Sequence, residues 1–106
     1  MFPRGIAVVA ITRHGAETAL NIKQALDREG LKNSIFAPKK YIQNGICELE
    51  GKIGDFIKES YGKFDAIVAV MATGITIRAV APYLESKLSD PAIIGVDAAG
   101  KFVISL

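Results

Sequence analysis

The sequence predicts an α/β domain with a doubly wound, mainly parallel sheet. Short apolar runs typical of strands buried on both faces alternate with segments of helical periodicity. Right-handed crossovers between such strands leave few topologies and favour the flavodoxin-like strand order 2-1-3-4. The chain has 106 residues, of which 50% are hydrophobic and 23% are charged, so we expect one domain over residues 1–106.

The predicted strands are the apolar, β-branched runs of the chain. They lie at residues 5–12, 33–38, 64–71, 91–97 and 101–106. The turn between the last two runs is too short for a parallel crossover, so the final strand should be antiparallel to its predecessor. The irregular segment 39–48 contains Asn44-Gly45, a turn signal, and is predicted as a surface loop.

Helices are predicted at residues 15–30, at 49–62 and from residue 74 or 75 onward. The first helix should end with Gly30 as its C′ residue. The third should turn Ile77, Val80 and Leu84 inward. Pro82 cannot donate a backbone hydrogen bond, so a kink or break is expected there.

Composition excludes several classes of protein. The net charge is only +2, from 13 Lys and Arg against 11 Asp and Glu, which is not the excess of a general nucleic-acid binder. The single Cys47 excludes an internal disulfide and a multi-cysteine metal site. No apolar run reaches the ~18 residues of a membrane span, and the first run is too short for a signal peptide. We therefore expect a soluble, cytoplasmic protein.

We expect the functional site where strand order reverses, outside the carboxyl ends of the strands at 5–12 and 64–71. Two loops should meet there, Thr12-Arg13-His14-Gly15 and Ala72-Thr73-Gly74. Each precedes a helix whose first amides and dipole favour an anion. Gly15 and Gly74 should let a ligand approach the backbone, and Arg13 and Arg78 could bind its carboxylate or phosphate groups.

Each of these residues also has a structural interpretation. Thr73 could be the N-cap of its helix, and Arg78 could be a solvated surface residue. His14, the only histidine, is a candidate acid or base or a loop residue without a catalytic role. Asp65 begins a predicted strand and should therefore face away from the crevice.

Missing motifs narrow the choice of ligand. The sequence has no G-x-G-x-x-G and no P-loop pattern, which disfavours a dinucleotide or a P-loop nucleotide. A receiver domain would need acidic residues after the first strand, where Thr12-Arg13-His14 offers the opposite charge. A flavin site would need flanking aromatic residues, for which only Tyr41 and Tyr83 are candidates.

The stretch FDAIVAVMATGITIRAVAPYLESKLSDPAIIGVDAAGKFVISL, residues 64–106, resembles a known family. It is similar to the N-terminal region of the cobalt-precorrin-5A hydrolases (CbiG), the G proteins of anaerobic cobalamin biosynthesis. That family typically reads A-x-G-I-x-x-R-x-I-A-P-x-L and then D-P-A-V-x-V-x-D-E-x-G-x-F-V-I-x-L. The corresponding residues here are Ala72-Thr73-Gly74-Ile75, Arg78, Ala81-Pro82, Leu84, Asp90-Pro91-Ala92, Asp97, Gly100 and Phe102-Val103-Ile104.

The resemblance has two departures. Ala98 stands where the family usually has Glu. The family also continues with L-S-G-H-x-G-G-A-N and a C-terminal domain, so we expect this chain to be the N-terminal part of a longer protein.

The resemblance implies a hydrolase that opens the δ-lactone of cobalt-precorrin-5A, releases acetaldehyde and gives cobalt-precorrin-5B. The cobalt then belongs to the corrinoid substrate, so no metal or other cofactor is expected in the protein. The amides of residues 73–75 would stabilise an oxyanion. The candidate substrate-binding residues are Thr12, Arg13, His14, Gly15, Ala72, Thr73, Gly74, Ile75 and Arg78. The alternative is a non-catalytic flavodoxin-like module that binds a carboxylate or phosphate ligand. The general base and the oligomeric state, a homo-oligomer included, are left open.

Overall fold

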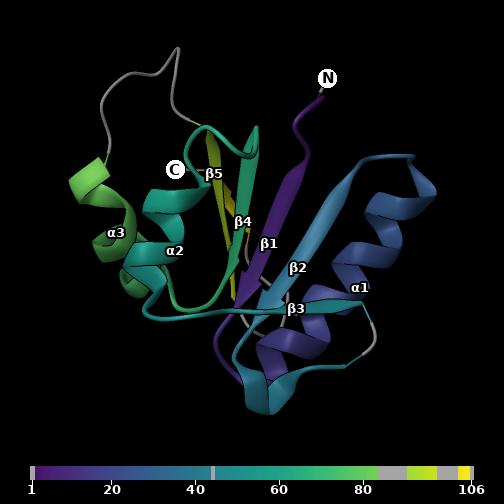
Figure 1. The fold of residues 1–106 in the computed structure, drawn as a ribbon, viewed down its shortest axis with the longest axis horizontal. Helices are drawn as coiled ribbons and strands as arrows, with labels where there is room; N and C mark the ends of the chain where they lie inside the picture. Colours follow the sequence, from purple (N-terminus) through teal and green to yellow (C-terminus); the bar gives the residue numbers. More distant parts are fainter. Residues whose placement is uncertain (1, 44, 84–90, 98–102, 106) are drawn as a thin grey trace.

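The computed structural model describes residues 2–43, 45–83, 91–97 and 103–105 (Figure 1). Within these residues a six-stranded sheet has the order β3-β2-β1-β4-β5-β6. The strands are β1 (Ile6–Ala10), β2 (Asn33–Ala37), β3 (Ile46–Glu48), β4 (Ala66–Val70), β5 (Ala92–Val96) and β6 (Val103–Ser105). The central neighbours β2-β1-β4-β5 are the predicted 2-1-3-4 order, which is confirmed.

The sheet is parallel from β3 to β5. Ile6 lies opposite Asn33 on one side and opposite Ala66 on the other, so β1 is central and β4 directly adjoins it. All five residues of β1 and all five of β4 are buried, as expected of strands covered on both faces. At the far edge β6 pairs antiparallel with β5, with Gly95 opposite Ile104.

Strand β3 corrects the prediction of a surface loop over residues 39–48. The segment begins with a 3₁₀ turn at Lys39–Tyr41, and Gly45 has a φ of 90°. The chain then pairs with β2, Ile46 opposite Ile35. Only Ile46 of the three residues in β3 is buried, so the sequence carries no alternation long enough to indicate a strand.

Helix α1 (Arg13–Arg28) covers one face of the sheet, while α2 (Ile53–Ser60) and α3 (Thr73–Val80) lie side by side on the other (Figure 1). Two apolar cores result, one on each face of the sheet. Among the helices that the structure describes, none is long and apolar enough to cross a membrane.

Helix α1 ends as predicted. Glu29 is the C-cap, and Gly30 follows with a φ of 71°. The amide of Gly30 donates to the carbonyl of Asp27 at 3.0 Å, and that of Leu31 donates to the carbonyl of Leu26 at 3.0 Å. These two bonds form the Schellman motif, which satisfies the last carbonyls of the helix.

Helix α2 is shorter than the predicted range 49–62. It begins at Ile53, after Gly51 with a φ of 74°. Leu49 is nevertheless buried, because its amide donates to the carbonyl of Ala37 at 2.8 Å and extends the pairing of β3 with β2. The apolar periodicity that predicted a helix from residue 49 therefore included Leu49, which is held by the sheet and is not part of the helix.

Helix α3 corrects one predicted face. Val80 is buried, but the side chain of Ile77 is 50% exposed and Thr76 is 1% exposed. The helix turns Thr76, Ala79 and Val80 inward, so a polar residue occupies the position expected for an apolar one. Helix α3 ends at Val80 and passes into a 3₁₀ turn at Ala81–Tyr83, so the break expected at Pro82 is confirmed. Leu84 lies outside the described residues.

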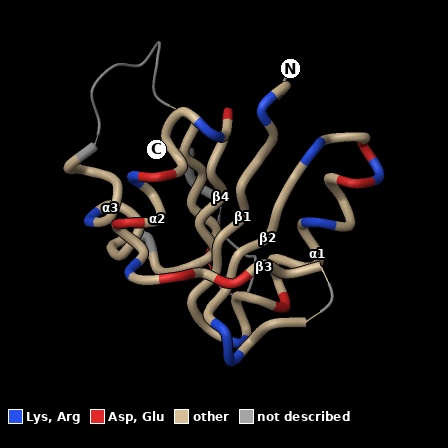
Figure 2. Tube along the Cα trace, viewed as in Figure 1, with Lys and Arg blue, Asp and Glu red and all other residues tan. Residues whose placement is uncertain are grey.

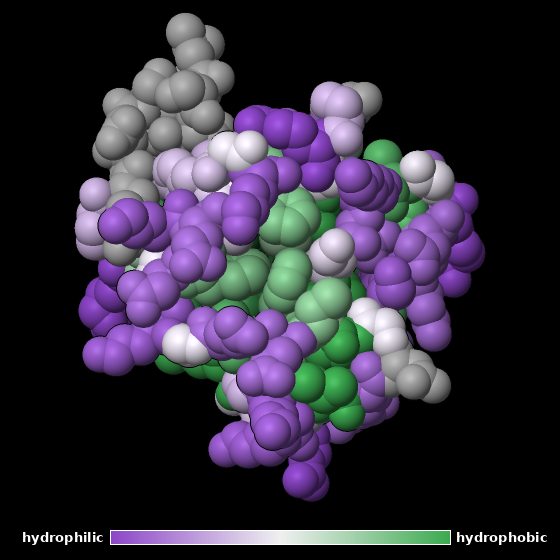
Figure 3. Space-filling view, in the orientation of Figure 1, coloured by the Kyte–Doolittle hydropathy of each residue, from purple (hydrophilic) through white to green (hydrophobic). Residues whose placement is uncertain are grey.

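Apolar residues gather on the face of the molecule shown in Figure 3. Three phenylalanine rings, from β2, from α2 and from the segment before β4, lie together on the α2 side of the sheet. The ring of Phe36 lies 4.9 Å from that of Phe56 and 6.0 Å from that of Phe64, centroid to centroid. The three rings line a groove of about 280 Å³ together with Glu48 and Glu59.

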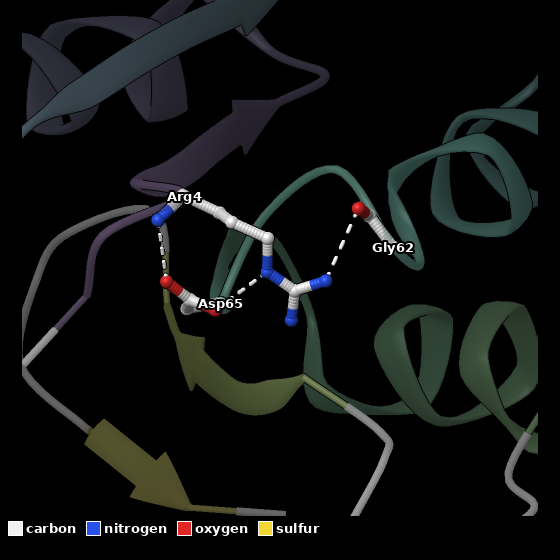
Figure 4. A network of polar contacts seen from close by, with 3 residues as sticks. All are labelled: Arg4, Gly62 and Asp65. Carbon is white, nitrogen blue, oxygen red and sulfur yellow. Dashed lines mark hydrogen bonds and ion pairs between the residues drawn. The ribbon is translucent and has the colours of Figure 1, made fainter.

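The amino ends of the strands are closed by an ionic network (Figure 4). The backbone amide of Arg4 donates to Oδ2 of Asp65 at 2.7 Å. The side-chain Nε of Arg4 donates to Oδ1 of Asp65 at 2.8 Å. Arg4 Nη1 also donates to the carbonyl of Gly62 at 3.1 Å. These hydrogen bonds from Arg4 lower the pKa of Asp65. Asp65 therefore ties the N-terminal segment to β4 at the end of the sheet opposite the crevice, as predicted.

Candidate functional site

The two predicted loops meet at the carboxyl ends of β1 and β4. Ala10 lies directly opposite Val70, so residues 11–12 and 71–72 leave the sheet side by side. From β1 the chain continues to β2 on one side, whereas β4 lies on the other side. This pair is therefore the point where strand order reverses, and the first turns of α1 and α3 begin beside it on opposite faces (Figure 1).

On the α1 side of the crevice, a side chain caps the start of the helix. Thr12 is the N-cap, and its Oγ1 accepts the amide of Gly15 at 2.9 Å. The amide of Ala16 donates to the carbonyl of Thr12 at 2.9 Å. A ligand would therefore find the amides of Arg13 and His14, but not those that follow, available in this first turn.

Gly15 has a different role from the predicted one. It is buried, and a Cβ at this position would lie 2.9 Å from Thr12 Oγ1 and 3.0 Å from the carbonyl oxygen of Val70. The missing side chain lets α1 pack against the end of β4, and ligand access to the backbone is not what it provides. Gly15 thus lies beneath the crevice.

Arg13 and His14 are both exposed on the first turn of α1. His14 is the second residue of the helix, whereas the sequence placed it in a loop. Within the described part of the chain, neither side chain forms an ion pair. The geometry therefore leaves Arg13 available to an anion and does not assign His14 a catalytic role.

The α3 side lacks a side-chain cap. Ala72 is the N-cap, with no hydrogen bond from its side chain, and Thr73 is the first helical residue. The interpretation of Thr73 as N-cap is therefore wrong. The amides of Ile75 and Thr76 both donate to the carbonyl of Ala72, at 3.0 and 3.2 Å. The amides of Thr73 and Gly74 remain as first-turn donors, and Ile75 drops out of the predicted trio.

Arg78 lies over this uncapped turn. Its Nη1 is 3.6 Å from the position that a Cβ on Gly74 would occupy, so the guanidinium folds back towards the start of α3. Gly74 is exposed and meets no other atom there within 4 Å. Arg78 forms no ion pair with any residue that the structure describes. Its charge therefore adds to the positive potential of the Thr73 and Gly74 amides.

A groove that the sequence did not indicate joins this turn to α2. It has a volume of about 310 Å³ and is lined by Lys52, Ile53, Gly54, Asp55, Ile75, Arg78 and Ala79. Lys52 is the N-cap of α2 and also lacks a side-chain cap bond. Ile75 is half-buried and forms part of the apolar lining. Only tertiary packing brings Lys52 to Arg78, so no sequence spacing could have shown it.

The described residues offer anion-binding groups rather than metal ligands. No three His, Cys, Asp or Glu side chains of the described ranges are grouped to hold a metal ion. Tyr41, one of the two candidate aromatic residues, lies in the 3₁₀ turn after β2 at the same end of the sheet. The Tyr83 side chain lies outside the description. The geometry is that of a crevice with two groups of free amides and several unpaired cations.

This fold and crevice define a doubly wound α/β domain with a candidate site for an anionic ligand. Comparison with known proteins gives its family. Residues 55–106 match a family model described as cobalamin synthesis G N-terminal. The chain therefore carries the N-terminal domain of the cobalamin synthesis G family, and the resemblance found in the sequence is confirmed.

The relatives extend this similarity over most of the chain. The cobalt-precorrin-5A hydrolase of Salmonella typhimurium is 29% identical over 104 residues, covering 98% of this chain and 28% of the relative. That of Priestia megaterium is 29% identical over 101 residues, covering 94% and 27%. A crystal structure of a cobalamin biosynthesis protein G homologue from Sulfolobus solfataricus has a TM-score of 0.78 at 27% identity, covering 97% and 29%. The chain thus spans under a third of each relative.

Proposed function

We propose that this domain forms part of the substrate site of a hydrolase that opens the δ-lactone of cobalt-precorrin-5A, releases acetaldehyde and gives cobalt-precorrin-5B. The observation that carries the proposal is the uncapped start of α3 with Arg78 folded over it. This turn lies at the switch point of the sheet and inside the segment that matches the family. The similarity to two cobalt-precorrin-5A hydrolases supplies the reaction.

The substrate is a cobalt-corrinoid with several acetate and propionate carboxylates. Arg78 would bind one carboxylate through its planar fork of donors. The Thr73 and Gly74 amides belong to the turn beside which this guanidinium lies. Lactone opening places negative charge on the former carbonyl oxygen. Two preorganised backbone donors would stabilise that charge. The cobalt arrives with the substrate, so the residues here would bind and orient the macrocycle and stabilise the developing negative charge.

Water activation requires a general base, which these residues do not assign. His14 is exposed on the α1 side of the sheet, with no described side chain to orient it. Because the chain spans 28% of the Salmonella typhimurium hydrolase, we propose that a further domain of a longer protein supplies the base.

The second candidate function is a non-catalytic module that binds a carboxylate or phosphate ligand at the same crevice. It is favoured by the groups that meet there, which are free amides and arginines, and these bind anions but do not abstract protons. The two functions share the site and differ in chemistry.

An anaerobic assay of acetaldehyde release from cobalt-precorrin-5A separates them. The Salmonella typhimurium hydrolase serves as the positive control. Release by this protein, lost in Arg78→Gln, establishes the hydrolase. Saturable substrate binding without release indicates a binding part that needs a further domain. Neither binding nor release, with an active control, would leave only the non-catalytic module.

A further inference from the structure

A second cationic groove lies at the same end of the sheet as Arg78 but on the opposite face. It has a volume of about 190 Å³ and is lined by Arg13, Ala16, Glu17, Lys40, Tyr41, Ile42 and Gln43. One wall is the first turn of α1, and the other is the 3₁₀ turn Lys39–Tyr41 with the residues after it. Figure 2 shows basic residues, which are lysines, on this turn after β2, at the carboxyl ends of the parallel strands.

The walls of this groove combine charge with apolar surface. Lys40 Nζ lies 5.2 Å from the centroid of the Tyr41 ring, which holds the ammonium at the wall by a cation–π contact. Tyr41 itself packs against the α1-side core, so the wall is anchored. Ile42 is 42% exposed, a large apolar surface beside two cations. Such a lining suits a ligand with an apolar body and carboxylate side chains.

The two cationic positions are far apart. Arg13 is on α1 and Arg78 on α3, on opposite faces of the sheet. A helix with its side chains is about 10–12 Å wide and the sheet lies between the two helices, so their axes are separated by more than about 10 Å. A ligand much smaller than this separation does not extend from one helix to the other. A macrocycle with carboxylates around its rim can do so.

We propose that the groove formed by Arg13, Lys40 and Tyr41 is a second carboxylate subsite, so that the domain holds a macrocyclic polycarboxylate at two points across the end of its sheet. This inference rests on the proposed function and extends it. Arg78 and the start of α3 bind one edge of the macrocycle. Arg13 and Lys40 bind another, and Ile42 contacts the apolar ring.

Glu17 provides a substitution whose expected effect on affinity is opposite to that of Arg13 and Lys40. It lines the same groove, and its carboxylate repels a carboxylate ligand. Glu17→Gln should therefore strengthen binding while Lys40→Gln weakens it. Two distant substitutions make the same charge changes elsewhere, since Glu29 caps the other end of α1 and Lys32 precedes β2 at the amino end of the sheet.

The probe is cobyrinic acid, a corrinoid with seven free carboxylates, titrated into the protein at low salt and followed by its absorbance. We expect Lys40→Gln and Arg13→Gln each to raise the Kd about fivefold and Glu17→Gln to lower it about threefold. Lys40→Arg should retain most of the affinity. Lys32→Gln and Glu29→Gln should change it by less than about 1.5-fold. Cobinamide, whose side chains are amidated, should bind weakly and equally to all variants.

Three results overturn the inference. If Arg78→Gln weakens the binding of cobyrinic acid but Lys40→Gln and Arg13→Gln do not, the proposal of a second subsite is wrong and the proposed function stands. Equal effects of Lys40→Gln and Lys32→Gln would also overturn it, because they indicate attraction by overall charge. If the wild-type protein does not bind cobyrinic acid at all, both the inference and the proposed function fail.

Discussion

Arg4 at the amino end of the sheet and three cations at its carboxyl end differ in their partners. At the amino end, Arg4 is engaged by Asp65 and by the carbonyl of Gly62, and the N-terminal segment is fixed to β4. At the carboxyl end, Arg13, Lys40 and Arg78 form no ion pair with any described residue. The charge of Arg4, which stabilises the fold, is paired with Asp65 within the fold. Cations left unpaired around a crevice are free to bind a ligand.

The same contrast separates the two helices that begin at the crevice. Helix α1 is capped by Thr12, whereas α3 begins at Ala72 without a side-chain cap. Four substitutions or pairs of substitutions test this division, and we order them from the largest expected effect to the smallest.

Gly15→Ala should destabilise the protein most. The added Cβ would lie 2.9 Å from Thr12 Oγ1 and 3.0 Å from the carbonyl oxygen of Val70, so the helix or the strand end must move. We expect a loss of about 1–3 kcal/mol in the free energy of unfolding, measured by urea denaturation. Gly54→Ala in α2 is the control, because a Cβ there meets nothing within 4 Å and should stabilise by about 0.5–1 kcal/mol. Equal effects at both positions would contradict the close packing of α1.

Removing the cap of α1 should lower stability. Adding a cap to α3 should raise stability and weaken ligand binding. Thr12→Ala removes the acceptor of the Gly15 amide and should cost about 1 kcal/mol. Ala72→Ser provides an acceptor for the first turn of α3 and should add up to about 1 kcal/mol. Because the new hydroxyl competes for the amides of that turn, Ala72→Ser should also weaken cobyrinic acid binding. Thermal unfolding and titration on the same samples test both parts. A stabilised variant with unchanged affinity would show that these amides do not bind the ligand.

Arg78→Gln should separate affinity from stability. We expect an increase of about fivefold in the Kd for cobyrinic acid, equal to about 1 kcal/mol, with a change in unfolding free energy below about 0.5 kcal/mol. The exposed guanidinium contacts no described acidic group, so its loss leaves nothing unpaired. A large fall in melting temperature with unchanged affinity would instead make Arg78 a structural residue.

Asp65→Asn should have the smallest effect, and one that depends on pH. The pKa of Asp65 is lowered in the folded protein by its hydrogen bonds from Arg4. Its stabilising contribution is therefore present above the unfolded pKa of about 3.9 and is lost as the pH falls through the lower folded value. The melting temperature of Asp65→Asn should lie below that of the wild type at pH 7, and the difference should shrink below pH 4. A constant difference down to pH 2 would contradict this linkage.

Much of the sheet was predictable because its signal is local. The buried strands β1 and β4 are continuous apolar runs, and the end of α1 follows from a glycine at a position that requires a positive φ. Strand β3 was missed because three residues with one buried side chain carry no period. The inward face of α3 was wrong because Thr76 is buried with its hydroxyl donating to the Ala72 carbonyl at 3.5 Å.

The candidate site was predictable only in part, for a similar reason. Arg78 is one turn from the start of its helix, so its return to Gly74 is a consequence of helical spacing. The grooves that add Lys52 and Lys40 require the packing of α2 on α3 and of the 3₁₀ turn on α1. Gly15 was misread because a glycine in a loop sequence does not show whether ligand or protein approaches it.

The central position of β1 also bears on how the protein is made. Ile6 is synthesised before α1, β2, β3 and α2, whereas its partner Ala66 on β4 follows all of them in the chain. Until β4 is made, the apolar strand has β2 on one side and an open edge on the other. The crevice therefore forms only after β4 has been synthesised, and any slowing of translation between β2 and β4 prolongs the period in which the nascent chain is prone to aggregate.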